Sequence, residues 1–189
     1  DRTSGRVTAQ GNVVVITREG DKRWMDLPRE RAYLRRCREA VPGVTAVCKQ
    51  GRHAHYNVFI SMKKMSEGDP GRAAAAALTF DHTKNVFVFD DDIDVFNPTD
   101  ILWAIATRVQ PHRQVSILQP LFRGNFLDPS LVDEIKTSGM IVDATKPLDR
   151  PFSPVSKCPD EAMERIKLEE YVPGEVLQHI PMDRTTYWA

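Results

Sequence analysis

The sequence has few of the features that stabilise secreted or membrane-spanning chains. Its three cysteines, Cys37, Cys48 and Cys158, are odd in number and widely spaced, without a C-x-x-C pair. This usage disfavours a disulfide framework and a thiolate zinc site, and it fits a reducing cytoplasm. The longest uniform apolar run, AAAAALTF, is much shorter than the ~20 residues that span a bilayer. The polar N-terminus lacks the apolar core of a secretory signal. We therefore expect a soluble cytoplasmic protein.

An excess of charge of either sign is also absent. Lys+Arg and Asp+Glu both number 26 among 189 residues, and the pI is about 7.1. Balanced charge creates no global field that would attract nucleic acid or an anionic membrane. We expect neither as a partner, and any charged contact has to be local.

Apolar runs that favour strands alternate with segments that favour helices between about residues 43 and 145. This alternation predicts a three-layer α/β fold with a mixed, largely parallel sheet. The run NVFVF (85–89) is apolar throughout, as expected of a strand that is covered on both faces. The segment SLVDEIKTSG (130–139) predicts a short helix that ends at Gly139.

The texture of the sequence changes at about residue 148, where it becomes rich in proline. We therefore predict an α/β domain at residues 1–147 and an extended tail with one short helix at residues 148–189. The tail has little apolar content of its own to bury, so we expect it to pack on a partner.

A dense group of aspartates follows the apolar run 85–89, where a strand is expected to end. In parallel sheets, functional loops follow the carboxyl ends of the strands. One interpretation is a Mg-dependent phosphohydrolase, for which only Asp143 and Lys146 could supply the further ligands on later strands. A second is a structural Ca or Mg loop, although its glycine turn and distal glutamate are missing. The aspartates are Asp90, Asp91, Asp92 and Asp94.

A third interpretation is structural. Asn97, Pro98 and Asp100 together form a helix start, because asparagine caps, proline fits the first position and a carboxylate favours the positive end of the macrodipole. The aspartates would then accept hydrogen bonds from the loop and this helix, with Arg108 or Arg113 balancing their charge. The residue pattern alone leaves the three interpretations open.

Four segments resemble, in order and in approximate spacing, the C-terminal domain of the UbiD family. They are NVFISMKK (57–64) ahead of an alanine-rich helix, the D-D-D-I-D run (90–94), the W-A-x-x-T-R helix (103–108) and the D-A-T-K loop (143–146). Members of this family are reversible decarboxylases that use prenylated FMN on aromatic or α,β-unsaturated acids.

The resemblance also implies what lies elsewhere. Family members are more than twice as long, and their flavin-binding barrel, metal and phosphate ligands and catalytic residues lie upstream of the matched part. It therefore implies no catalytic residue and no metal ligand in this chain. Prenylated FMN, with a Mn or K ion, would be held by a larger UbiD-like flavin-binding subunit in a hetero-oligomer. The chain is either a small subunit or the C-terminal part of a longer enzyme, and we favour the subunit.

By the same resemblance, this domain provides an oligomer interface and one wall of the substrate pocket. Basic residues at the start of the alanine-rich helix, Arg72 and Lys64, are expected to reach towards the flavin phosphate. Phe126 could stack on a flat conjugated acid, or it could be an ordinary core residue. The residues expected at the pocket wall are Phe122, Asn125, Phe126 and Leu127.

Two other functional classes remain open from the sequence. A non-catalytic α/β scaffold or interaction protein could keep the fold without the enzyme. The phosphohydrolase that uses the run Asp90 to Asp94 is the third possibility.

Overall fold

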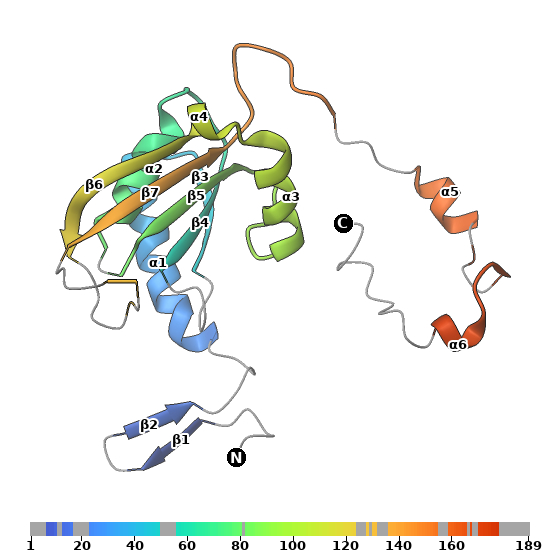
Figure 1. Cartoon of the computed structure of the whole chain (residues 1–189), viewed down its shortest axis with the longest axis horizontal. Coiled ribbons are helices and arrows are strands. Elements are labelled where there is room, and N and C mark those ends of the chain that lie inside the picture. Colours follow the sequence, from blue (N-terminus) through green and yellow to red (C-terminus); the bar gives the residue numbers. More distant parts are fainter. Residues whose placement is uncertain are drawn as a thin grey trace. The chain divides into compact units, whose positions relative to one another are not determined.

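A computed structural model describes residues 7–10, 13–16, 23–49, 56–80, 82–123, 128, 130–131, 136–154, 159–165, 167 and 170–177 (Figure 1). The chain divides into two compact units, Asp1–Lys146 and Pro147–Ala189. The helices and strands in chain order are β1 Val7–Gln10, β2 Val13–Ile16, α1 Arg23–Ala40, β3 Val44–Cys48, β4 Asn57–Met62, α2 Asp69–Leu78, β5 Asn85–Asp90, α3 Pro98–Arg108, α4 Pro111–Gln114, β6 Val115–Arg123, β7 Lys136–Ala144, α5 Asp160–Arg165 and α6 Gly174–Leu177.

A mixed five-stranded sheet forms the centre of the first unit, with strand order β3-β4-β5-β7-β6. The central pairs β4–β5 and β5–β7 are parallel, whereas β3–β4 and β6–β7 are antiparallel. The parallel strands β4, β5 and β7 therefore end at the same edge of the sheet. The predicted α/β fold with a mixed sheet is confirmed, and strands β1 and β2 form a separate antiparallel hairpin.

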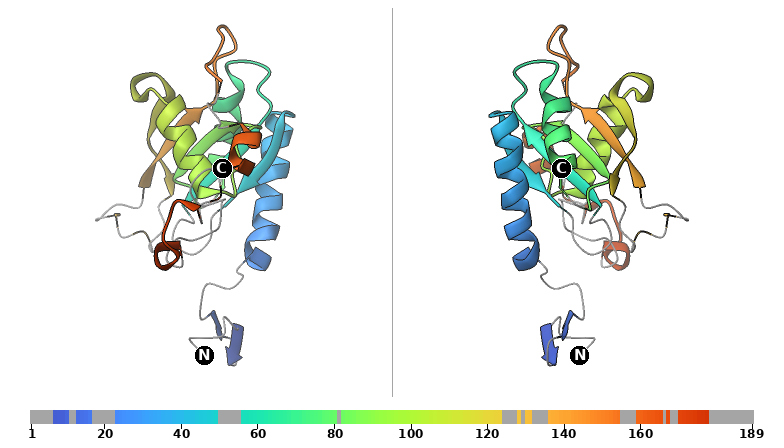
Figure 2. Two further views of the ribbon diagram at one scale, coloured as in Figure 1. Left: turned by 90° about the vertical axis from the view of Figure 1, so that its right-hand side faces the viewer. Right: turned by 90° about the vertical axis from the view of Figure 1, so that its left-hand side faces the viewer.

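Helices cover both faces of this sheet, because its strands are apolar on both sides. Val58, Ile60 and Met62 of β4 pack in the cluster that also contains residues of α1 and α2. Phe59, which alternates with them, belongs to the opposite cluster together with residues of α3. Figure 2 shows α1 and α3 on opposite sides of the sheet. Complete burial of a side chain such as Ile60 contributes about 1.5–3 kcal/mol, so the two-sided core fixes the layer order.

The last strand is longer than the sequence predicted. The expected helix ending at Gly139 is wrong for residues 136–139, which belong to the nine-residue strand β7. β7 pairs antiparallel with β6 over registers such as Ile117 opposite Met140 and Phe122 opposite Thr137. This long antiparallel pairing overrides the local preference of the segment, as tertiary context commonly does.

Gly43 allows the chain to approach the end of β4 closely. The amide of Lys63 donates a 2.8 Å hydrogen bond to the carbonyl of Gly43. A Cβ added at residue 43 would collide with the backbone carbonyl oxygen of Lys63. Only glycine therefore fits here without a backbone shift, and the contact positions the loop that carries Lys64.

The second unit contains the short helices α5 and α6. Tyr171 and Val176 are exposed there. In the part of the chain that the structure describes, each helix is too short or too polar to cross a bilayer.

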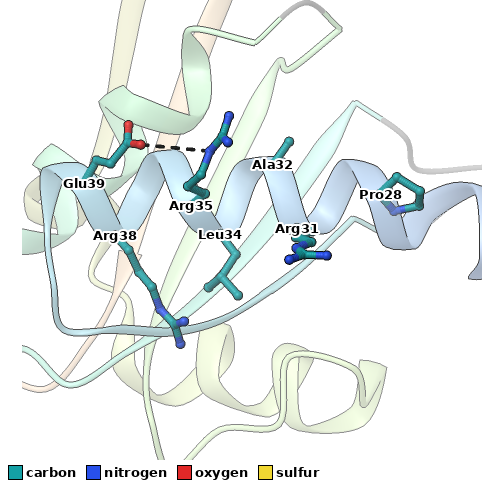
Figure 3. A pocket seen from close by; sticks show the side chains of 7 residues that line it. All are labelled: Pro28, Arg31, Ala32, Leu34, Arg35, Arg38 and Glu39. Carbon is teal, nitrogen blue, oxygen red and sulfur yellow. Dashed lines mark ion pairs between the residues drawn. The ribbon is translucent and has the colours of Figure 1, made fainter.

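An open space of about 740 Å³ lies along α1, bordered by side chains on two sides of that helix, and we call it the arginine groove (Figure 3). Within it, Arg35 lies 3.9 Å from Glu39, and both side chains are exposed. The residues that line the arginine groove are Pro28, Arg31, Ala32, Leu34, Arg35, Arg38 and Glu39.

Candidate functional site

Local sequence signals place the first side chains of the candidate site. Strand β5 ends at Asp90, and α3 begins with the predicted cap, in which the side chain of Asn97 accepts a hydrogen bond from the amide of Thr99. Pro98 occupies the first turn, and the helix ends at Arg108. The α3 helix therefore returns Arg108 to the aspartates with which the loop begins.

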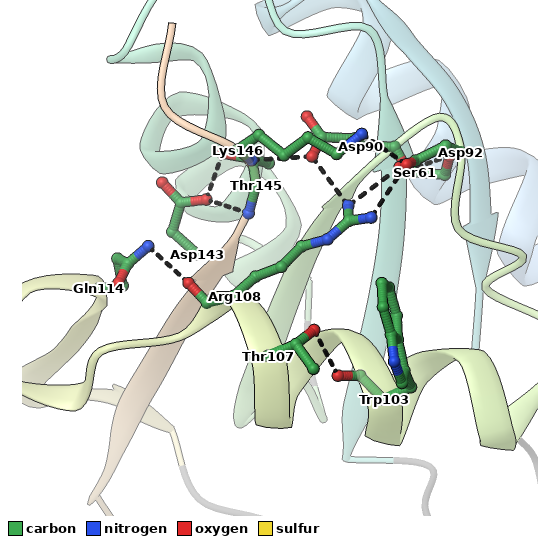
Figure 4. A network of polar contacts seen from close by, with 10 residues as sticks. All are labelled: Ser61, Asp90, Asp92, Trp103, Thr107, Arg108, Gln114, Asp143, Thr145 and Lys146. Atoms are coloured by element: carbon green, nitrogen blue, oxygen red, sulfur yellow. Dashed lines mark hydrogen bonds and ion pairs between the residues drawn. The ribbon is translucent and has the colours of Figure 1, made fainter. Parts of the chain in front are cut away.

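An ion-pair network around the buried Arg108 lies at the carboxyl edge of the sheet (Figure 4). The Arg108 side chain is 0% exposed. Its Nη1 donates to Asp90 Oδ2 at 3.0 Å and to Asp92 Oδ1 at 2.9 Å, and its Nη2 donates to Asp92 Oδ2 at 2.9 Å. The guanidinium also lies over the Trp103 ring, 5.3 Å from its centroid. One arginine thus balances two carboxylates that would otherwise repel each other.

Lys146 connects the end of β7 to the same aspartates. Its backbone amide donates to Asp90 Oδ2 at 2.8 Å, and its Nζ donates to Asp92 Oδ2 at 2.6 Å. Two segments that are more than fifty positions apart in the sequence therefore meet at one pair of carboxylates. The structural interpretation of the run holds for Asp90 and Asp92, with Arg108 as the buried cation.

The two carboxylates have opposite pKa shifts. Burial would raise the pKa of Asp92, but hydrogen bonds from Arg108 and Lys146 outweigh it and lower this pKa to about 2. Burial raises the pKa of Asp90, and the Lys146 amide and the Arg108 charge compensate only in part. Charge-assisted hydrogen bonds to the ionised form account for the difference.

The other aspartates of the run face solvent. Asp94 accepts a 2.9 Å hydrogen bond from the amide of Phe96, and Asp91 is exposed. They border a cleft of about 390 Å³ that also reaches Thr45 and Ser61 of the neighbouring strands. Among the described residues, no group of three or more His, Cys, Asp or Glu side chains is placed to hold a metal ion.

Lys64 and Asp143 form a second buried polar group at this edge. The Lys64 side chain is 3% exposed, and its Nζ donates to Glu67 Oε2 at 2.9 Å. Burial raises the pKa of Asp143, while hydrogen bonds from Thr145 and the charge of Lys64 act against the rise. The predicted phosphate contact Lys64 therefore points its ammonium group into the protein.

Arg72, the other predicted phosphate contact, lies on the outside of the same loop and helix. Its side chain is 63% exposed and pairs with the buried carboxylate of Asp69. Asp69 also accepts hydrogen bonds from the amides of Met65 and Ser66, each at 2.9 Å. The Arg72 hydrogen bond contributes most to lowering the pKa of Asp69, to about 2. Arg72 thus has free surface for an anion, and its phosphate role remains a prediction.

The predicted pocket wall lies largely beyond the described residues. Phe122 is in β6 opposite Thr137. Asn125, Phe126 and Leu127 lie outside the described residues, so their roles remain predictions. No pattern in the sequence predicts that Thr45 and Ser61 border the cleft next to Asp91 and Asp94. Only the antiparallel pairing of β3 with β4, in which Thr45 Oγ1 donates to the Ser61 carbonyl at 3.0 Å, brings them there.

Comparison with known proteins gives a consistent result. Residues 23–144 match the family described as the 3-octaprenyl-4-hydroxybenzoate carboxy-lyase C-terminal domain. The anhydromevalonate phosphate decarboxylase of Aeropyrum pernix is 40% identical over 127 residues, which cover 66% of this chain and 29% of that protein. The chain thus spans less than a third of the length of this relative.

Solved structures of similar fold include a UbiD-class enzyme and a vanillic acid decarboxylase. The enzyme HmfF from Pelotomaculum thermopropionicum, in complex with FMN, has a TM-score of 0.63 and 36% identity over 76% of this chain and 32% of its own. An evolved dimeric form of HmfF, in complex with prFMN, has a TM-score of 0.57 and 32% identity, and the match covers 76% of this chain and 29% of the HmfF chain. The vanillic acid decarboxylase ShVdcCD of Sedimentibacter hydroxybenzoicus, in closed form, has a TM-score of 0.60 and 31% identity. The match covers 73% of this chain and 30% of the decarboxylase chain.

Proposed function

Because this chain belongs to the UbiD family of carboxy-lyases, in which it corresponds to the C-terminal domain, we propose that it works as the small or C-terminal component of a UbiD-type decarboxylase. The substrate would be an aromatic or α,β-unsaturated carboxylic acid. A larger UbiD-like flavin-binding component would carry the prenylated FMN and its metal ion. The observation that carries the proposal is the match to a C-terminal domain, which covers 29% of one relative and 32% of another.

The ion pairs of the described site favour a structural role for this chain rather than a catalytic one. Arg108 and Lys146 are committed to Asp90 and Asp92, and Lys64 is committed to Glu67. A cation bound in this way stabilises the loops at the carboxyl edge of the sheet. The contribution of the chain would thus be geometric, because it shapes and dries one wall of the pocket and fixes the quaternary structure.

Arg72 is the described residue that we expect to contact the flavin cofactor. The exposed guanidinium of Arg72, near the N-terminus of the ten-residue helix α2, would hold the phosphate. When bound, prenylated FMN would accept electron density from the substrate as carbon dioxide leaves or arrives. The Asp69 contacts to Met65 and Ser66 would keep the start of α2, which bears Arg72, in place.

Co-purification with a flavin-binding UbiD-like protein tests the proposal. The untagged chain is expressed together with a tagged candidate partner, and the complex is assayed for flavin content and for release of carbon dioxide from aromatic acids. We expect the chain to be retained and the activity to depend on it. If the chain elutes alone, and the partner is equally active without it, the proposal is wrong and the non-catalytic scaffold is favoured.

A further inference from the structure

Two ion pairs lie where the chain passes from β4 into α2, and they differ in which partner is buried. In the Lys64–Glu67 pair the lysine side chain is 3% exposed and the glutamate side chain is 57% exposed. In the Arg72–Asp69 pair the carboxylate side chain is 4% exposed and the arginine side chain is 63% exposed. The first pair therefore presents a carboxylate to solvent, and the second presents a cation.

The two carboxylates also differ in how firmly they are held. Asp69 accepts hydrogen bonds from the amides of Met65 and Ser66 and from the Ser66 hydroxyl group. Moving this buried carboxylate would leave those donors without an acceptor, which is costly. The Glu67 carboxylate is largely in water, so water can solvate it when it moves away from Lys64. Glu67 is therefore the partner that an incoming anion can displace.

The buried ammonium group of Lys64 requires an anion. Its Nζ donates to Glu67 Oε2 at 2.9 Å, and a buried cation without an acceptor is strongly unfavourable. Asp143 also lies close to this pair, because the charge of Lys64 lowers its pKa and the charge of Glu67 raises it. Lys64 thus has two carboxylates near it, of which Glu67 is the more exposed. Removal of Glu67 alone would open the ammonium group to a ligand from solvent.

We propose that Glu67 is an internal competitor for the anion site of Lys64, and that its carboxylate occupies the ammonium group until a dianionic phosphate group displaces it. A dianion with three acceptor oxygens makes stronger charge-assisted hydrogen bonds than one carboxylate does. A monoanion gains little by the same exchange, so Glu67 makes the site selective for phosphate. The inference rests on the phosphate contact in the proposed function, and it gives the buried Lys64 a way to take part in that contact.

Binding of inorganic phosphate to the full chain, without a partner, tests the exchange. Phosphate is titrated at constant ionic strength while NMR follows the backbone amides of residues 63–72. Glu67→Gln keeps the length of the side chain and removes its charge, and its neutral amide competes less strongly for the ammonium group. We expect this variant to bind phosphate about tenfold more tightly than wild type, which equals about 1.4 kcal/mol.

Two further variants show whether the gain depends on Lys64. Glu30→Gln removes an equal charge at the opposite edge of the sheet, where Glu30 accepts a hydrogen bond from the Lys49 amide, and it should bind phosphate as wild type does. In a Lys64→Met background, Glu67→Gln should give no gain, although the other cations of the segment remain. An equal gain in Glu30→Gln or in the Lys64→Met background would overturn the inference. Identical phosphate binding by Glu67→Gln and wild type would also overturn it.

A comparison of FMN with riboflavin, which lacks the phosphate group, keeps the test decisive if Lys64→Met does not fold. Flavin fluorescence measures both affinities in the co-purified complex after its flavin has been removed. Glu67→Gln should bind FMN about tenfold more tightly than wild type and riboflavin equally well, whereas the same change for both flavins, or none for either, refutes the inference alone. If the complex does not form, the proposed function fails, and the phosphate titration of the chain by itself still decides the role of Glu67.

Discussion

Arg108→Met is the substitution that most directly probes the ion-pair network. Methionine keeps much of the arginine side-chain volume and removes the three hydrogen bonds to Asp90 and Asp92. Removing one member of a buried ion pair costs about 3–5 kcal/mol, because the remaining charge stays buried without its partner.

The exposed fractions of the carboxylates place the expected loss at the lower end of that range. The side chains of Asp90 and Asp92 are 15% and 39% exposed, and Lys146 still pairs with Asp92 after the substitution. Water and Lys146 would therefore compensate part of the loss. We expect a decrease of roughly 3 kcal/mol in the free energy of unfolding, or roughly 6–12 °C in Tm for a chain of this size.

The pH dependence gives the prediction a second test. The pKa of Asp92 is about 2 in the folded protein, below the ~3.9 of an unfolded aspartate. Its ion pairs stabilise the fold above about pH 4, and this contribution is lost as the pH falls towards about 2. The deficit of Arg108→Met should accordingly be largest near neutral pH and shrink in acid, where a protonated Asp90 and Asp92 no longer need a cation.

Urea unfolding followed by circular dichroism at several pH values measures these quantities. Arg113→Met removes an exposed arginine five positions away and should change the free energy of unfolding by less than about 0.5 kcal/mol. The triple substitution with Asp90→Asn and Asp92→Asn should recover part of the loss, because the only charge then left without its partner is Lys146, whose side chain is 37% exposed. If Arg108→Met lowers the free energy of unfolding by less than about 1 kcal/mol, and this difference does not vary with pH, the ion pairs of Arg108 do not stabilise the fold.

Three further substitutions test other parts of the structure. Gly43→Ala places a methyl group against the carbonyl oxygen of Lys63 and should lower the free energy of unfolding by roughly 1–3 kcal/mol; an unchanged urea midpoint would contradict the close approach. Asn97→Ala removes the α3 cap and should cost about 1 kcal/mol in the same assay, whereas Asn97→Ser, which keeps a capping oxygen, should cost less. Arg72→Ala leaves the buried Asp69 carboxylate without its cation and should cost roughly 1–3 kcal/mol of stability. It should also weaken flavin retention about tenfold in the co-purified complex, and equal flavin content in both complexes would count against the phosphate role.

Short-range signals account for the parts of the structure that the sequence predicted well. The apolar run of β5 became a buried central strand. Asn97 and Pro98 began α3 as expected, since a cap and a first-turn proline act within a few residues. The segments that resemble the UbiD family also keep their order along the chain, and the match to residues 23–144 confirmed the family.

The misassigned segment shows where local signals fail. Residues 136–139 were predicted as a helix end but belong to β7, because β6 offers a long antiparallel partner that is more than ten positions away in the sequence. Strand formation depends more on such partners than on intrinsic preference. No reading of that segment by itself could have supplied its partner.

The sequence by itself determined the family, the mixed α/β architecture, and a group of aspartates at the end of a buried strand. The tertiary structure alone decided that Arg108, and not Arg113, enters that group, and that Lys146 joins it from the end of β7. It also decided that the Lys64 side chain is buried and the Arg72 side chain is exposed, although both were predicted to contact the same phosphate. Charge pairing of this kind depends on which distant segments meet and on how deeply they are buried, and both are properties of the folded chain.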